Sequence, residues 1–164
     1  MNILITNDDG INSAGLITLA QAISTIANVT IVAPDRERSA TAHAITMHKP
    51  LRVEKTDIPG CKALGYKVNG TPSDCVKLAL EALLKDAPDF VLSGINRGAN
   101  LGTDVIYSGT VSAAIEAALL GVPAIALSVT SHGSIEFDYA ANFAKNLCQQ
   151  ISKQSFPKDT LLNV

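Results

Sequence analysis

Polar residues that could bind a metal ion follow directly after the first apolar segment of the chain. Residues 3–5 are Ile, Leu and Ile, and they lead into Asn7, Asp8, Asp9 and Gly10. Two adjacent carboxylates at the end of a buried strand repel each other, and a bound cation offsets that repulsion. Asp8 and Asp9 are therefore candidate metal ligands. Taken alone, the same residues also fit a solvated turn in which Gly10 supplies a positive φ.

Two other loops supply neutral oxygen donors. Ser39 lies in the sequence PDRERSATAH, which follows an apolar segment at 29–35. Asn96 lies in the sequence SGINRGANLG, which follows the apolar residues of a segment at 89–96. If both segments are strands of one parallel sheet, their carboxyl ends meet where open α/β sheets bind ligands.

Oxygen ligands favour Mg²⁺ or Mn²⁺ over zinc. We predict one such ion per subunit, with the two aspartates as the catalytic residues as well as ligands. Two negative and two neutral ligands balance a dication and leave positions for water and an anionic substrate, which favours phosphate. The predicted metal ligands are Asp8, Asp9, Ser39 and Asn96.

A predicted helix start supplies the candidate phosphate contacts. Ser108, Gly109 and Thr110 open the helical segment 108–121, and small residues there allow a phosphate to approach the backbone. The N–H groups of a helix start attract anions, so we predict that these three residues and Asn96 bind phosphate. Simple helix capping by Ser108 or Thr110 fits the same residues.

Apolar segments that alternate with helical patterns predict an α/β fold with a largely parallel sheet. The polar–apolar alternation at 46–68 indicates strands or hairpins at the sheet edge or on top of it. A capping box, Thr71 with Asp74, opens one of the predicted helices. The predicted strands span 2–6, 29–35, 89–96, 122–129 and 159–164, and the predicted helices span 16–26, 71–84, 108–121 and 137–151.

Composition narrows the classes of partner. The chain has 164 residues, of which 47% are hydrophobic, and this predicts a single domain over residues 1–164. The net charge of −2 gives no electrostatic reason to expect DNA or an anionic membrane as partner. No secretory signal or bilayer-spanning segment is visible, so we expect a cytoplasmic protein. Residues 159–164 read as one more buried strand, and we expect the chain to be a fragment of a longer protein.

Five segments resemble motifs of the SurE family of survival-protein 5′/3′-nucleotidases, and they occur in the family's order between Met1 and Ser128. They read ILITNDDGINSAG, VAPDRERSA, VNGTPSDCV, LSGINRGANLGTDVIYSGTVSAA and GVPAIALS. The resemblance implies a Rossmann-like, three-layer α/β/α fold and a metal-dependent phosphatase acting on nucleoside 5′- and 3′-monophosphates. It also implies a homodimer or homotetramer when the full-length chain is present.

The resemblance carries over to the same site residues. Asp8, Asp9, Ser39 and Asn96 match the family's divalent-metal ligands, and Gly109 and Thr110 match its phosphate-contacting segment. Two features depart from the family. Position 40 is Ala where the family usually has Gly, and family members continue well past residue 164.

One alternative function stays open, and the residues of the chain exclude another. A non-catalytic nucleotide- or phosphate-binding module would need the same binding residues as an enzyme. A signalling receiver domain also carries an acidic pair after its first strand, but it needs a phosphate-accepting Asp at another strand end. Here the segment 89–96 supplies Ser93 and Gly94 at that place.

Overall fold

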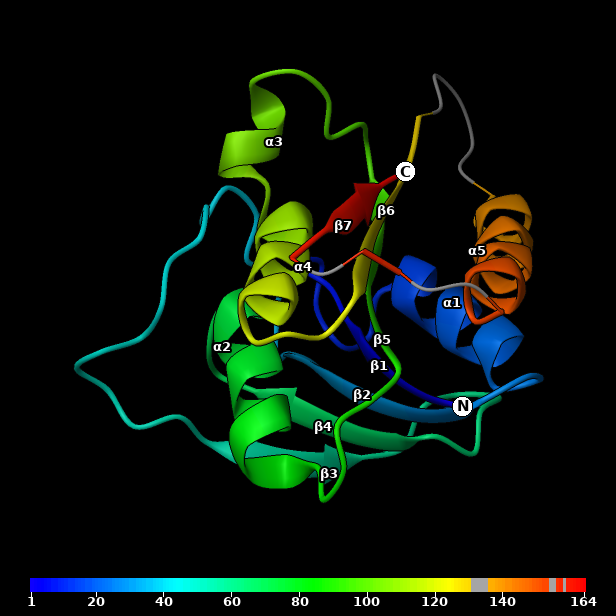
Figure 1. Cartoon of the computed structure of the whole chain (residues 1–164). Helices are drawn as coiled ribbons and strands as arrows, with labels where there is room; N and C mark the ends of the chain where they lie inside the picture. The colour runs from blue at the N-terminus through cyan, green and yellow to red at the C-terminus, as the bar shows by residue number, and fades with distance from the viewer. Residues whose placement is uncertain (131–135, 154–155, 158) are drawn as a thin grey trace.

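The computed structural model describes residues 1–130, 136–153, 156–157 and 159–164. Seven strands form one sheet in the order β3-β4-β2-β1-β5-β6-β7 (Figure 1). Every neighbouring pair is parallel except β3 and β4, which are antiparallel. The strands are β1 Asn2–Thr6, β2 Asn28–Pro34, β3 Val53–Thr56, β4 Leu64–Val68, β5 Phe90–Arg97, β6 Ala124–Val129 and β7 Leu161–Asn163.

Helices cover both faces of the sheet, which confirms the predicted three-layer α/β/α fold. Two helices, α1 and α5, pack on one face, and α2 and α4 pack on the other (Figure 1). One apolar core, which includes Ile3 and Ile5 of β1, lies under the first pair, and a second core, which includes Leu4, lies under the other. The helices are α1 Ala14–Ile23, α2 Pro72–Leu78, a π-helical turn η1 Ala79–Leu83, α3 Asp104–Tyr107, α4 Gly109–Leu119 and α5 Asp138–Ile151.

The register of the central strands aligns their carboxyl ends. Ile5 of β1 pairs with Ile31 of β2, and Thr6 of β1 pairs with Ser93 of β5. Since β1, β2 and β5 run in the same direction, the segments that follow them emerge at one edge of the sheet. This is the edge where the sequence places the candidate ligands.

The structure differs from the sequence prediction at four places. Residues 46–52 form no strand, so only the second half of the alternating segment pairs into the sheet. The short helix α3 was not expected, and α1 ends at Ile23, before Ile26. The last strand, β7, is half-buried rather than buried, because it is an outer strand of the described sheet and pairs there with β6 alone.

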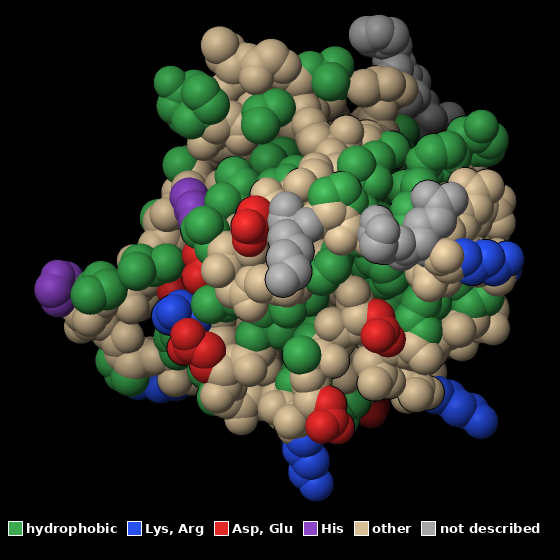
Figure 2. Space-filling model, in the orientation of Figure 1, with side chains coloured by type: hydrophobic (Ala, Val, Ile, Leu, Met, Phe, Trp, Pro, Cys, Tyr) green, Lys and Arg blue, Asp and Glu red, His purple; other side chains and the backbone are tan. Residues whose placement is uncertain are grey.

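The surface gives two further observations. Hydrophobic side chains spread across the face seen in Figure 2, between β7 and α5, while Lys and Arg side chains lie toward its margins. None of the helices in the described part of the chain is long and apolar enough to span a bilayer.

Candidate active site

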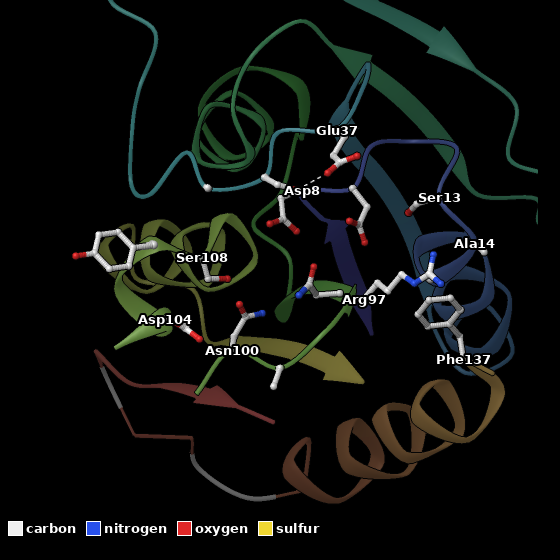
Figure 3. Close-up of a pocket in the computed structure, with 16 residues that line it drawn as sticks. Asp8, Ser13, Ala14, Glu37, Arg97, Asn100, Asp104, Ser108 and Phe137 are labelled. Carbon is white, nitrogen blue, oxygen red and sulfur yellow. Dashed lines mark hydrogen bonds between the residues drawn. The ribbon is translucent and has the colours of Figure 1, made fainter. Parts of the chain in front are cut away.

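A cavity of about 720 Å³ opens at the carboxyl edge of the sheet. This volume is in the range of pockets that hold small-molecule ligands. In Figure 3, Asp8, Asn100 and Ser108 point toward a common centre, with Arg97 and Phe137 on one side. The four predicted metal ligands, Asp8, Asp9, Ser39 and Asn96, all line this cavity.

The loop after β1 is held by Asn7, which is fully buried. Its amide nitrogen donates to the Gly10 carbonyl at 3.1 Å and to Ser13 Oγ at 2.7 Å, and its amide oxygen accepts from the Gly10 N–H at 3.2 Å. Ser13 in turn caps α1, because its hydroxyl accepts from the Leu16 N–H. Asn7 therefore fixes the turn that carries the two aspartates, and the prediction did not assign it this part.

The loops after β1 and β2 are fastened to each other. The Arg38 N–H donates to the Asp8 carbonyl at 2.7 Å, and the Ile11 N–H donates to the Pro34 carbonyl at 2.8 Å. Gly10 has φ of +97°, and a Cβ there would lie 3.0 Å from the backbone of Arg36. Glycine is therefore needed at position 10 for two reasons: the loop after β2 approaches closely, and the turn has a positive φ.

Asp8 lies against the first turn of α4. Thr110 Oγ1 donates to Asp8 Oδ1 at 2.5 Å, across 102 positions of sequence. A Cβ on Gly109 would lie 2.8 Å from Asp8 Cβ and 3.0 Å from Asp8 Oδ2. Asp8 is only 5% exposed, so its carboxylate is enclosed on the side that faces the helix.

Ionisation of both aspartates is disfavoured in this cavity. Burial raises the pKa of Asp8, and hydrogen bonds from Thr110 and nearby backbone groups partly oppose the shift. Burial and the neighbouring Asp8 charge raise the pKa of Asp9 to about 6, and Arg97 opposes this shift. Glu37 adds a further negative charge that raises both pKa values.

The donor groups of the two neutral candidate ligands already have hydrogen-bond partners in the protein. Ser39 Oγ donates to Glu37 Oε1 at 2.7 Å, and the Asn96 amide nitrogen donates to the Gly98 carbonyl at 2.9 Å. A hydroxyl has one proton, so a Ser39 that donates to Glu37 offers its oxygen to the cavity as an acceptor. Ala40, beside Ser39, has φ of +54°, a left-handed conformation that favours glycine.

The predicted phosphate residues divide into two groups. Ser108 and Asn96 line the cavity, whereas Gly109 and Thr110 lie behind that wall, against Asp8. The Ser108 hydroxyl also accepts from the Val111 N–H and so caps α4.

Of the histidine and arginine side chains in these loops, Arg97 lines the cavity. His43 instead contacts Glu116 on α4, with 2.7 Å between Nε2 and Oε2. Arg38 faces away from the cavity, toward Asp35 and the Asn69 carbonyl.

The donor set fits a hard divalent cation. No cluster of three or more His, Cys, Asp or Glu suited to a metal ion occurs within the described ranges. A cation would thus depend on the Ser39 and Asn96 oxygens as well as on the two aspartates. The charge of the cavity supports a cation too, because four carboxylates face one guanidinium across it. The charged lining residues are Asp8, Asp9, Glu37, Asp104 and Arg97.

Sequence reasoning did not assign four polar residues that line the cavity: Ser13, Glu37, Asn100 and Asp104. Glu37 lies two positions before Ser39, and it was not singled out because charged loop residues are usually solvated. Asn100 is buried, and its amide donates to Ser128 Oγ of β6 at 2.8 Å. Only the pairing of β5 with β6 brings Asn100 and Ser128 together, and no local signal in the sequence shows that contact.

The fold and the cavity together define a class of protein: three-layer α/β proteins with an acidic, oxygen-lined site at the carboxyl edge of a parallel sheet. Residues 3–164 match the family described as "Survival protein SurE". The chain belongs to the SurE family.

Individual relatives agree with this assignment. A protein named 5'-nucleotidase SurE from Thermoanaerobacter sp. (strain X514) is 52% identical over 164 residues, which are 100% of this chain and 65% of that protein. A protein of the same name from Geobacter sulfurreducens is 54% identical over 166 residues, covering 100% of this chain and 61% of that protein. The crystal structure of the SurE protein from Aquifex aeolicus has a TM-score of 0.91 at 41% identity, over 99% of this chain and 64% of that one. The chain thus spans less than two thirds of the length of these relatives.

Proposed function

We propose that this chain carries the active site of a metal-dependent phosphomonoesterase that hydrolyses nucleoside 5′- and 3′-monophosphates to nucleoside and phosphate. One observation carries the proposal: four oxygen-bearing residues at the carboxyl ends of three neighbouring strands line one acidic cavity. Relatives that are 52% and 54% identical bear the name 5'-nucleotidase SurE, which supports the substrate class.

Asp8, Asp9, Ser39 and Asn96 would hold one Mg²⁺ or Mn²⁺ ion. When bound, such an ion supplies positive charge that draws electrons from the phosphoryl group and neutralises its oxygens. The residues of the chain position this site: Glu37 orients Ser39, Gly98 orients Asn96, and Thr110 holds Asp8.

The substrate phosphate would contact the wall formed by Asn96 and the start of α4. At the start of α4, Ser108 lines the cavity, and its hydroxyl can accept or donate a hydrogen bond. A partly positive helix start beside the phosphate stabilises its negative charge. Contact of phosphate with Gly109 and Thr110 stays a prediction, since both residues face Asp8 in this structure.

We also propose that the full-length protein works in the cytoplasm as a homodimer or homotetramer. The family resemblance supports the oligomeric state. Size-exclusion chromatography with light scattering on the full-length protein would measure the oligomer directly.

A phosphate-release panel tests the proposed reaction. The full chain would be incubated with nucleoside 5′- and 3′-monophosphates and with simple phosphomonoesters, each with Mg²⁺, with Mn²⁺ or with EDTA. We expect phosphate release from mononucleotides with a divalent ion and none with EDTA. Nucleotide binding without phosphate release would instead identify a non-catalytic binding module, and equal release in EDTA would rule out metal dependence.

A further inference from the structure

We infer that Thr110 and Gly109 are positioning residues for Asp8, so that the start of α4 acts on the cation through the Asp8 carboxylate. This inference rests on the proposed function, because it concerns the same metal site. It assigns the two residues a task different from the phosphate contact that their place at a helix start predicts.

The first step concerns the Thr110 hydroxyl. It donates to Asp8 Oδ1 at 2.5 Å, and the Thr110 N–H also contributes to the hydrogen bonding of this carboxylate. Thr110 is fully buried and does not line the cavity. Since a hydroxyl carries one proton, a Thr110 that donates to Asp8 cannot donate the same proton to a phosphate.

The second step concerns the missing side chain at Gly109. A Cβ there would meet Asp8 Cβ at 2.8 Å and Asp8 Oδ2 at 3.0 Å, and contacts under 3.0 Å require something to shift. The glycine therefore lets the helix start close against Asp8, near enough for Thr110 to reach Oδ1.

Together the two contacts hold the Asp8 carboxylate in one orientation against the helix start. Oδ1 accepts the hydrogen bond from Thr110, and Oδ2 lies beside Gly109, where no side chain intervenes. Rotation of the carboxylate would break that hydrogen bond inside a buried site, where a lost partner is costly. Partners that orient a metal ligand in this way typically change metal affinity by about 10- to 100-fold when they are mutated.

The test compares Mn²⁺ dissociation constants of full-chain variants, measured by electron paramagnetic resonance without substrate. Thr110→Val removes the hydroxyl and keeps the shape, Thr110→Ser keeps the hydroxyl, and Gly109→Ala adds the Cβ that collides with Asp8. Thr6→Val is the matched control, because Thr6 is equally buried and its hydroxyl has no hydrogen-bond partner in the described part of the chain. Thermal unfolding of every variant reports whether it folds.

We expect Thr110→Val to bind Mn²⁺ about 10- to 100-fold more weakly, with Thr110→Ser and Thr6→Val close to wild type. Gly109→Ala should weaken binding as well, and it serves as the second arm if Thr110→Val does not fold. Wild-type Mn²⁺ affinity in both Thr110→Val and Gly109→Ala would overturn the inference and leave the proposed function standing. A direct phosphate contact would appear as a raised KM with unchanged Mn²⁺ affinity. Absence of Mn²⁺ binding by the wild-type chain would overturn both proposals.

Discussion

Asp8 and Asp9 are neighbours in sequence, but they occupy different environments. Asp8 is enclosed by α4 and bonded to Thr110, whereas Asp9 is less buried and lies near Arg97. A rigid carboxylate and a more exposed one are suited to different tasks. In the proposed metal site, Asp8 would provide a fixed ligand oxygen and Asp9 would add negative charge to the cavity.

Replacement of Asp8 tests its place as the principal ligand. Asp8→Asn removes a negative charge and keeps the side-chain shape, so the fold should survive while metal-dependent phosphate release is abolished. Circular dichroism and thermal unfolding check the fold, and a phosphate-release assay with Mn²⁺ checks turnover. Near-normal activity would refute the assignment of Asp8.

The neutral ligands should matter less than Asp8. Ser39→Ala and Asn96→Ala each remove one uncharged oxygen, so each should weaken Mn²⁺ binding and turnover without abolishing them. Titration calorimetry with Mn²⁺ and the same turnover assay measure both effects. A loss equal to that of Asp8→Asn in either variant would contradict this order.

The raised pKa of Asp9 predicts a pH dependence of stability in the metal-free chain. Between the ordinary value of 3.8 and about 6, the folded state holds a proton on Asp9 that the unfolded state has released. The free energy of unfolding therefore falls as the pH rises through this window, by at most about 1.4 kcal/mol per pH unit for one proton. Asp9→Asn should remove the part of the slope that comes from Asp9 and leave the part that comes from Asp8, whose pKa is also raised. Urea unfolding in EDTA at several pH values measures it.

The exposed residue Asp57 provides the control for this titration. Asp57→Asn should retain the slope of the wild-type chain, because Asp57 is not part of the buried acidic cluster. An unchanged slope in Asp9→Asn would show that another group is responsible.

Ala40 is a residue of the Ser39 loop whose backbone carries strain. Its φ of +54° costs an alanine more than a glycine, so Ala40→Gly should raise the free energy of unfolding by about 0.5–1 kcal/mol. Ala87→Gly is the matched control, because Ala87 is exposed in a loop and has no positive φ. That control should lower stability slightly. Urea unfolding measures the free energy of unfolding of both variants. A lower value for Ala40→Gly than for the wild-type chain would contradict backbone strain at Ala40.

At the scale of elements, the segment that carries Ser39 is fastened to α2 and α4. His43 contacts Glu116 of α4, and the Ala44 carbonyl accepts from Thr71 Oγ1 at 2.7 Å. Thr46 donates to both carboxylate oxygens of Asp74, at 2.9 Å from its N–H and 2.6 Å from its hydroxyl. These contacts hold a long segment without strand or helix against α2 and α4.

Asp74 joins two functions in one side chain, because it completes the capping box of α2 and anchors Thr46. Asp74→Ala should therefore cost about 3 kcal/mol of stability, which combines a lost cap with a lost buried hydrogen bond to a charge. Asp86→Ala, in an exposed loop position, is the control. Chemical denaturation measures the loss, and a cost near zero would show that the anchoring contacts contribute little.

The elements themselves could be predicted from local patterns. β1 begins and ends where the apolar segment does, and the capping box of Thr71 and Asp74 is present as expected. The four ligand candidates could be assigned to one edge because parallel strands align their ends. The contacts that orient them could not, since Thr110 reaches Asp8 across 102 positions and His43 reaches Glu116 across 73. Such pairs depend on how α4 packs on the sheet, and residue types alone do not specify it.

At the scale of the whole molecule, the sheet brings three loops to one point. β1, β2 and β5 are neighbours in the sheet, and each delivers at least one candidate ligand at its carboxyl end. The neighbouring α4 encloses that point from one side, and Arg97 and Phe137 line the cavity on another (Figure 3). The position of the candidate site thus depends on the strand order.

A crystal structure of the chain soaked in Mn²⁺, with data collected at the manganese absorption edge, tests the shared cation most directly. We expect one anomalous peak in the cavity, with Asp8, Asp9, Ser39 and Asn96 oxygens all within ligand distance of it. A peak bound elsewhere, or side chains that turn away from one another around an empty cavity, would contradict a cation shared by these loops.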